Sequence, residues 1–303
     1  MADFDLASDS LALPPGAWAR THRRRLRHGG RTVLALTQGA HRPYVFPLMT
    51  PAGYPVTAEA PADHPHHASL WIGADHVHAP QPTAAGVVEE YTYNFYTDET
   101  FQGRAPGRLV ERRCGGAPDG AGGFVIKQEI DWRGPAEWAA AAGRLVVLEE
   151  RVTRVAVGEG HYRLDVASTL TAGERAVRLG PTRHAFFNVR VADGLMVANG
   201  GTVRDDRGRV GGAAISGEGA RWVDFSGPVG GGHLAGVTVI AGPLEGREPF
   251  WFVVDWGVVT VGPFREQALE LEPGRSFTAQ YAVIVHDGDA EAAGIERLAS
   301  NRE

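Results

Sequence analysis

The sequence predicts an all-β protein, a large antiparallel β-sandwich with few short helices. Three observations support this prediction. The apolar segments are short and rich in β-branched residues, they are bounded by Gly, Pro, Asn or Asp, and helical periodicity is scarce. The chain has 303 residues, of which 43% are hydrophobic, so it can bury a large core. Many short strands between turn signals are typical of a sandwich or a barrel.

Seven segments carry the clearest strand pattern. Residues 162–166 alternate apolar and polar side chains, as a strand with one face in water does. The other six are short apolar runs at residues 32–36, 123–126, 144–148, 237–240, 251–256 and 282–285. Turn signals lie between them, including Gly29-Gly30, Asp119-Gly120, Asp206-Arg207-Gly208 and Asp287-Gly288.

The end of the chain contains the best helix candidate. Ala292, Ile295 and Leu298 fall at helical spacing, although Gly294 weakens the pattern. We find no linker and no internal repeat. We therefore expect one β-sandwich domain over residues 1–303, with an N-terminal extension at residues 1–20 and a C-terminal helix or tail at residues 290–303.

Composition excludes several classes of protein. The single cysteine, Cys114, rules out a disulfide framework and a Cys-rich zinc site. The formal charge of −6 argues against binding duplex nucleic acid. No apolar run is long enough to span a membrane, and the first ten residues carry acids where a secretory signal carries bases. We expect a cytoplasmic protein whose partner is a small-molecule substrate, and nothing in the sequence excludes a homodimer.

Histidines are concentrated in one segment. Six of the 12 lie between His41 and His78. Pro65 favours an extended backbone, in which residues two apart share a face, so His64 and His66 are expected to converge, and so are the histidines at 76 and 78. Imidazole both ligates metals and moves protons near neutral pH. The segment therefore predicts either an acid/base pocket or a metal site.

The acid/base interpretation makes His64, His66, His67 and His184 the catalytic groups. In the same pocket Arg42 would hold an anionic or carbonyl oxygen, and the aromatic side chains would wall the pocket or stack on a sugar ring. The candidate substrate-binding residues are Arg42, Tyr44, Trp71, Tyr91 and Asn188.

Two alternatives stay open. In the first, the pocket holds a divalent metal such as Zn²⁺, which would polarise a carbonyl or activate water. Its ligands would be His64, His66 and His78, with His67, Glu89 or Glu90 as further candidates, and no other cofactor is indicated. In the second, the chain is a non-catalytic carbohydrate-binding module with an exposed aromatic platform.

A second constellation surrounds His184. Alternation along residues 180–190 puts His184, Phe186 and Asn188 on one face of a strand, with Arg183 and Phe187 on the other. A His and an Asn that face the same way could bind and protonate a carbohydrate oxygen. The competing interpretation is a core strand whose histidine is hydrogen-bonded to a backbone carbonyl.

Residues 182–188 (Thr-Arg-His-Ala-Phe-Phe-Asn) resemble the Thr-Asn-His-Thr-Tyr-Phe-Asn motif of the galactose mutarotases. The resemblance implies that His184 is the general acid at the sugar ring oxygen. It also implies a carboxylate base near the C-terminal end, for which the candidates are Glu266, Glu270 and Glu272.

A wider resemblance is to the PmoA-like family of soluble bacterial proteins. It is carried by motifs in the family's order at residues 42–53, 63–71, 200–211, 221–227, 255–257, 262–264, 271–274 and 285–288. This chain departs from the family's pattern at residues 182–187 and 93–96. The resemblance implies a mutarotase-like supersandwich and a role in sugar catabolism.

These observations together predict a carbohydrate-processing enzyme that uses histidine general acid/base chemistry. The reaction would be an elimination or hydration, a hydrolysis or an isomerisation, and the substrate a glycoside or an oxidised sugar. The sequence therefore leaves lyase, hydrolase and isomerase open, with a metal-dependent lyase or hydrolase as the main alternative.

Overall fold

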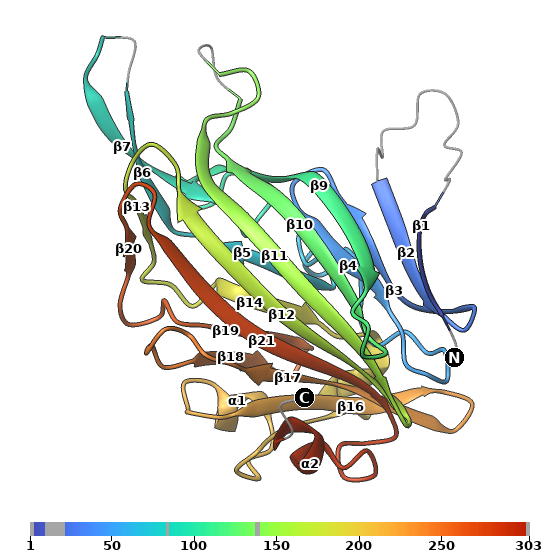
Figure 1. Ribbon diagram of the computed structural model, residues 1–303. Helices are drawn as coiled ribbons and strands as arrows, with labels where there is room; N and C mark the ends of the chain where they lie inside the picture. The colour runs from blue at the N-terminus through green and yellow to red at the C-terminus, as the bar shows by residue number, and fades with distance from the viewer. Residues whose placement is uncertain (1–2, 10–21, 83–84, 137–139, 301–303) are drawn as a thin grey trace.

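The structure, a computed structural model, describes residues 3–9, 22–82, 85–136 and 140–300. Two eight-stranded antiparallel sheets lie face to face, and a smaller five-stranded sheet extends beyond one end of them (Figure 1). The predicted all-β sandwich is confirmed.

The first sheet has the order β1-β2-β3-β4-β5-β14-β19-β18. All of its strand pairs are antiparallel. Its strands are β1 (Phe4–Ser8), β2 (His22–His28), β3 (Arg31–Gln38), β4 (Pro43–Leu48), β5 (Leu70–Ala74), β14 (Ala185–Arg190), β19 (Val258–Gly262) and β18 (Phe250–Val254).

The second sheet has the order β15-β16-β17-β21-β12-β11-β10-β9 and is also antiparallel throughout. Its strands are β15 (Thr202–Asp205), β16 (Trp222–Gly230), β17 (His233–Ala241), β21 (Ser276–Asp287), β12 (His161–Ala172), β11 (Leu145–Gly158), β10 (Phe124–Arg133) and β9 (Arg108–Pro118).

The third sheet has the order β20-β13-β6-β7-β8, and only β7 and β8 of these described strands pair in parallel. Its strands are β20 (Leu269–Leu271), β13 (Val177–Leu179), β6 (Val77–Pro82), β7 (Val88–Asn94) and β8 (Ala105–Pro106). The helices are short: η1 (Asp193–Leu195), η2 (Val197–Asn199), α1 (Gly212–Ile215) and α2 (Ile295–Ser300).

One apolar core lies between the two large sheets. Phe187 of β14 stacks on Tyr281 of β21, with ring centroids 4.6 Å apart, and Phe186 contacts Trp132 of β10. Because these contacts join strands of opposite sheets, they hold the sandwich together. Along β5, β14 and β19, alternate side chains such as Leu70, Val189 and Val259 enter this core, and the intervening ones face away from it.

All seven segments expected to be strands lie in strands, namely β3, β10, β11, β12, β17, β18 and β21. The strand predicted at residues 251–256 is too long at its C-terminal end, because β18 ends at Val254. Asp255, Trp256 and Gly257 form the turn that follows, and Gly257 adopts the left-handed φ of 94° that this turn requires.

The expected C-terminal helix is shorter than its apolar spacing suggests. Gly294 has a left-handed φ of 66°, so the helix α2 begins only at Ile295. Ile295 and Leu298 pack against Trp222 and Ile284 on the outer face of the second sheet. Residues 301–303 lie outside the described residues.

At the other end of the chain, part of the expected N-terminal extension joins the fold. Residues Phe4–Ser8 form β1 and pair with β2. Residues 1–2 and 10–20 of that expected extension lie outside the described residues.

Candidate functional site

A row of five side chains crosses the outer face of the first sheet. The registers place Tyr44 opposite Trp71, Trp71 opposite Asn188, Asn188 opposite Thr260, and Thr260 opposite Phe252. Residues that are directly opposite on neighbouring strands project from the same face. The row therefore forms a continuous floor that is turned away from the core.

The histidine segment covers one part of this floor. The ring of His67 stacks on Trp71 with centroids 5.3 Å apart and is 2% exposed. His64 stacks on His67 at 4.8 Å and on Trp256 at 4.5 Å. His66 meets the edge of His67 at 4.5 Å. The three imidazoles thus form one cluster.

The geometry of this cluster differs from the extended segment that we expected. His64 N–H donates to the Pro61 carbonyl and His67 N–H donates to the His64 carbonyl, so residues 61–67 form consecutive turns. Turns bring residues three apart together, which is why His64 stacks on His67 rather than sharing a strand face with His66.

Two buried arginines hold the segment in place. Arg190, 2% exposed, donates to Asp63 at 3.0 Å and lies 5.1 Å from the centre of the Trp256 ring. Arg42, 3% exposed, donates to the His66 carbonyl at 2.8 Å and to Asp98. Two nitrogens of the Arg42 guanidinium are therefore bound within the protein, and its expected contact with a substrate oxygen stays a prediction.

Burial keeps two imidazoles of the cluster, those of His66 and His67, uncharged. Burial, aided by the nearby positive charge of Arg42, lowers the pKa of His66 to about 4. Burial and the neighbouring His66 and His64 lower the pKa of His67 to about 2. Both imidazoles are neutral at pH 7, and each then offers one N–H donor and one nitrogen lone pair.

We expect this burial to make the folded state less stable as the pH falls from about 6.5 towards 4. In the unfolded chain the imidazoles of His66 and His67 take up protons near their ordinary pKa of 6.5, whereas the folded protein resists this. Stability therefore rises with pH across this window, by up to about 1.4 kcal/mol per pH unit for each group.

Urea midpoints measured between pH 7 and pH 4.5 check this expectation. The variant His66→Gln should show a shallower pH dependence than the wild type. His161→Gln, at the start of β12 in the other sheet, is the matched control and should follow the wild type. If the urea midpoint of His66→Gln depends on pH as steeply as that of the wild type, burial of a neutral His66 does not cause the pH dependence.

The second part of the site is a His–Asp pair at the edge of the same floor. His184 Nδ1 lies 3.1 Å from Asp75 Oδ2, and Arg183 Nε donates to His184 Nε2 at 3.3 Å. These contacts put the ring proton on Nδ1. The side chain of His184 is 27% exposed and that of Asp75 is 4% exposed, so the carboxylate is buried behind an accessible imidazole.

Asp75 is the centre of a hydrogen-bond network. Its carboxylate also accepts from Thr182 and from His76 Nδ1 at 2.7 Å. Burial raises the pKa of Asp75, but the hydrogen bonds from His184, Thr182 and His76 outweigh burial and bring it to about 2. Asp75 is therefore ionised at all working pH values. Sequence reasoning missed it, although it directly follows a buried strand and precedes a histidine.

Tyr96 joins the two parts of the site. Its ring centroid lies 5.8 Å from that of His66, 6.1 Å from that of His67 and 5.2 Å from that of His184. It also packs on Trp71 at 5.7 Å. Histidines that are more than 100 residues apart in the chain thus line one side of the molecule, around a buried tyrosine whose pKa is raised by burial.

The side chain of one predicted substrate-binding residue, Asn188, is hydrogen-bonded within the protein. The Asn188 amide is buried, donates to the carbonyls of Trp71 and Phe186 and accepts from Thr260. Phe186 does not share its face as expected. It packs into the core, as the next residue, Phe187, also does.

The other aromatic candidates have different surroundings. Tyr44 donates to Glu59, and burial raises its pKa. Trp71 is fully buried. Tyr91 lies on β7 of the third sheet, where it is 42% exposed, stacks on Tyr93 and donates to Glu89, so it is not part of the floor.

The predicted metal ligand set also needs correction. His78 lies on β6, where its ring contacts Thr92 and Glu90 rather than His64 and His66. Among the described residues, no group of three His, Cys, Asp or Glu side chains is arranged to hold a metal ion. The reason is topological, since β6 belongs to the third sheet and the histidine turns cover the first.

The three candidate bases do not meet His184. Glu266, Glu270 and Glu272 are exposed, and Glu270 pairs with Arg178 on the third sheet. The carboxylate that contacts His184 is Asp75.

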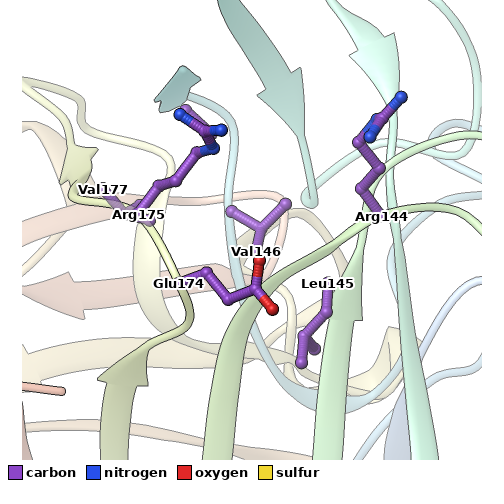
Figure 2. A pocket seen from close by; sticks show the side chains of 7 residues that line it. Arg144, Leu145, Val146, Glu174, Arg175 and Val177 are labelled. Atoms are coloured by element: carbon purple, nitrogen blue, oxygen red, sulfur yellow. The ribbon is translucent and has the colours of Figure 1, made fainter. Parts of the chain in front are cut away.

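A cavity of about 140 Å³ opens beside the histidine cluster and is lined in part by Arg42, Tyr44, Glu59, His66 and Asp98. A second cavity, of about 260 Å³, lies at the ends of β11 and β13. Figure 2 shows Arg144 and Arg175 on opposite sides of that second cavity, with Glu174 between them. It contains none of the predicted catalytic residues.

Several buried donors of the site have no hydrogen-bond partner among the described residues. They are His67 Nδ1, Trp71 Nε1, Arg42 Nε, and Nε and Nη1 of Arg190. Unpartnered buried polar atoms are rare in folded proteins and call for an explanation. Here four residues that carry them adjoin one histidine cluster.

Comparison with known proteins gives a family and a distant likeness in fold. A family model described as "Family of unknown function (DUF6807)" matches residues 23–300. No curated protein matches the sequence. None of the helices that the structure describes has the length and apolar character to cross a bilayer.

Among solved structures, the chain is similar to a polysaccharide lyase, with a TM-score of 0.35 and 12% identity. The match covers 95% of this chain but 33% of that one, so this chain spans about a third of that protein. It is also similar to a galactose mutarotase-like protein from Clostridium acetobutylicum, with a TM-score of 0.39, 8% identity and 95% and 99% of the two chains covered.

A putative aldose 1-epimerase from Escherichia coli K12 gives a TM-score of 0.34 and 11% identity, with 95% and 100% of the two chains covered. Likenesses at these TM-scores support no inference about activity. The matching family carries a different name from the PmoA-like family that the motifs resemble, so that resemblance stays a prediction.

Proposed function

The chain belongs to the family of unknown function DUF6807, and from its own site we propose that it is a carbohydrate-processing enzyme in which His184 is the general acid/base. One observation carries the proposal: a partly exposed imidazole is hydrogen-bonded through Nδ1 to a buried carboxylate, Asp75. This is the arrangement in which a carboxylate orients an imidazole for proton transfer.

The chemistry follows from the positions of the protons. Asp75 accepts from Nδ1–H and so leaves the lone pair on Nε2, the nitrogen that can take a proton from a substrate. Once protonated, the imidazolium is stabilised by the ionised Asp75 and can return the proton to a leaving or ring oxygen. A positioned acid/base group of this kind contributes roughly 10²–10⁴-fold to the rate.

The surroundings of His184 suit a sugar. The partly exposed ring of Phe252 lies 6.0 Å from its imidazole and offers an apolar face to the C–H side of a sugar ring. The buried ring of Tyr96 supports the imidazole from 5.2 Å. The neutral, partly exposed imidazole of His66 lies across Tyr96 and can exchange hydrogen bonds with hydroxyl groups. Elimination, hydrolysis and isomerisation each require a proton transfer that His184 could perform.

Proton NMR in D₂O on a panel of glycosides, keto sugars and uronates tests the proposal. Loss of a C–H signal, a new alkene signal, a released sugar or a changed anomeric ratio identifies the reaction. We expect His184→Gln to slow turnover of the substrate found by at least about 10²-fold, while His161→Gln leaves the rate unchanged.

Two results would count against the enzyme. Turnover that His184→Gln leaves intact would exclude this residue as the acid/base. A sugar that binds in calorimetry, with no turnover of any panel member, would instead favour a carbohydrate-binding module.

A further inference from the structure

The arginines beneath and beside the site are matched by carboxylates. Arg42 pairs with Asp98, and Arg190 pairs with Asp63 at 3.0 Å. Arg104 lies 3.7 Å from the central Asp75. Each guanidinium charge is therefore balanced within the protein, and none of the three is an open anion site.

Arg183 is an exception. It is exposed, its guanidinium carbon lies 4.9 Å from the centre of the Phe252 ring, and its Nε–H donates to His184 Nε2. Within the described part of the chain it forms no ion pair with a carboxylate. A guanidinium has five N–H donors, and four of those of Arg183 stay available.

A second guanidinium lies over another ring of the same strand, β18. Arg265 is exposed and its guanidinium carbon lies 5.0 Å from the centre of the Phe250 ring, again without an ion pair among the described residues. Phe250 and Phe252 are two residues apart on β18, so they project from the same face of the strand. β18 is the last strand of the first sheet. Two guanidiniums without an ion pair among the described residues therefore lie over its outer face, and that of Arg183 contacts His184.

We propose that the site takes a sugar that carries a carboxylate, and that Arg183 binds this carboxylate, with Arg265 adding to the positive field. The inference rests on the proposed function, since it places the anion next to His184. Arginine is suited to this role because its planar fork matches the two oxygens of a carboxylate. The sequence assigned an anion-binding role to Arg42, but the charge of Arg42 is paired with Asp98, whereas that of Arg183 has no paired carboxylate among the described residues.

Binding would also change the state of His184. In the structure the lone pair of Nε2 is occupied by the Arg183 N–H. When the guanidinium turns to a substrate carboxylate, Nε2 is released and faces the atoms next to that carboxylate. A single movement of the Arg183 side chain then binds the anion and exposes Nε2 of His184.

Binding of matched sugars tests the proposal without any need for turnover. Glucuronate is compared with glucose, and galacturonate with galactose, by isothermal calorimetry and by NMR of the histidine rings. We expect at least one uronate to bind about 10-fold or more tightly than its neutral partner and to shift the His184 resonances. Added NaCl should weaken binding of the uronate and leave binding of the neutral sugar unchanged.

Variants identify the group responsible. Arg183→Gln should lower the affinity for the uronate by about 10–100-fold, the range for losing a hydrogen bond to a charged group. Arg183→Lys should recover part of this affinity. Arg265→Gln should have a smaller effect. Arg297→Gln, which removes one exposed arginine from α2 on the other sheet, is the charge-matched control and should bind as the wild type does.

Equal binding of the charged and neutral members of both pairs, including no detectable binding of either, overturns the proposal. So does an Arg183→Gln variant that binds the uronate as the wild type does. The proposed function is decided separately by the turnover of His184→Gln. If His184→Gln keeps full activity while Arg183→Gln no longer binds the uronate, the assignment of His184 as the acid/base is wrong and the proposed anion site is supported.

Discussion

Asp75→Asn is expected to lower kcat by about 10²–10⁴-fold with little change in KM. The carboxylate accepts from His184 Nδ1 and directs the Nε2 lone pair to the substrate side. An asparagine amide can donate to Nδ1 instead, which moves the ring proton to Nε2 and removes the base. The pKa of Asp75 is about 2, so the wild type has this charge at every pH at which the enzyme would be assayed.

The tautomer provides a measurement that needs no substrate. Nitrogen-15 NMR should show the His184 proton on Nδ1 in the wild type and on Nε2 in Asp75→Asn. Asp165→Asn removes a carboxylate that pairs with Arg163 on the other sheet and should change neither the tautomer nor the rate. If kcat of Asp75→Asn is within about threefold of the wild-type value, Asp75 does not orient His184 for proton transfer.

Trp71→Ala is expected to give the largest loss of stability, about 3–5 kcal/mol in the free energy of unfolding. Trp71 is fully buried at the centre of the floor, beneath His67 and against Tyr96. Truncation leaves a cavity that the sheet cannot close and removes the surface on which the histidine cluster rests.

Urea unfolding followed by circular dichroism measures the effect. Trp71→Phe retains an aromatic ring and should lose much less stability. Trp256→Ala removes the 36% exposed tryptophan on the other side of His64, and should cost less than about 1 kcal/mol. A loss in Trp71→Ala no larger than that of Trp256→Ala would mean that the floor is not a packed layer.

The strands were predictable from the sequence because their signal is local. Residues 162–166 of β12 alternate with a period of two, and the structure keeps that alternation through the whole strand. The errors occurred where a single residue interrupts a pattern. Gly257 ends the turn after β18, and Gly294 delays the start of α2.

The site was predictable only in part. The density of histidines identified the segment at residues 64–67, and the motif at residues 182–188 identified His184. Asp75 was missed, and Tyr96 was expected only as one of several aromatic side chains that could wall the pocket. Asp75 directly follows the buried strand β5, and buried acids are usually paired, but two of its partners, Thr182 and His184, are more than 100 residues away in the chain.

By itself, the sequence determined that the chain folds into strands, which segments form several of them, and that six of the 12 histidines lie between His41 and His78. These properties depend on side-chain spacing over a few residues. Only the tertiary structure decided that β5, β14 and β19 are neighbours, and hence that His184 meets Asp75, that Tyr96 lies between two groups of histidines, and that Arg42 is buried while Arg183 is open. The order of strands in a sheet is set by the packing of the whole core, and a short stretch of sequence does not encode it.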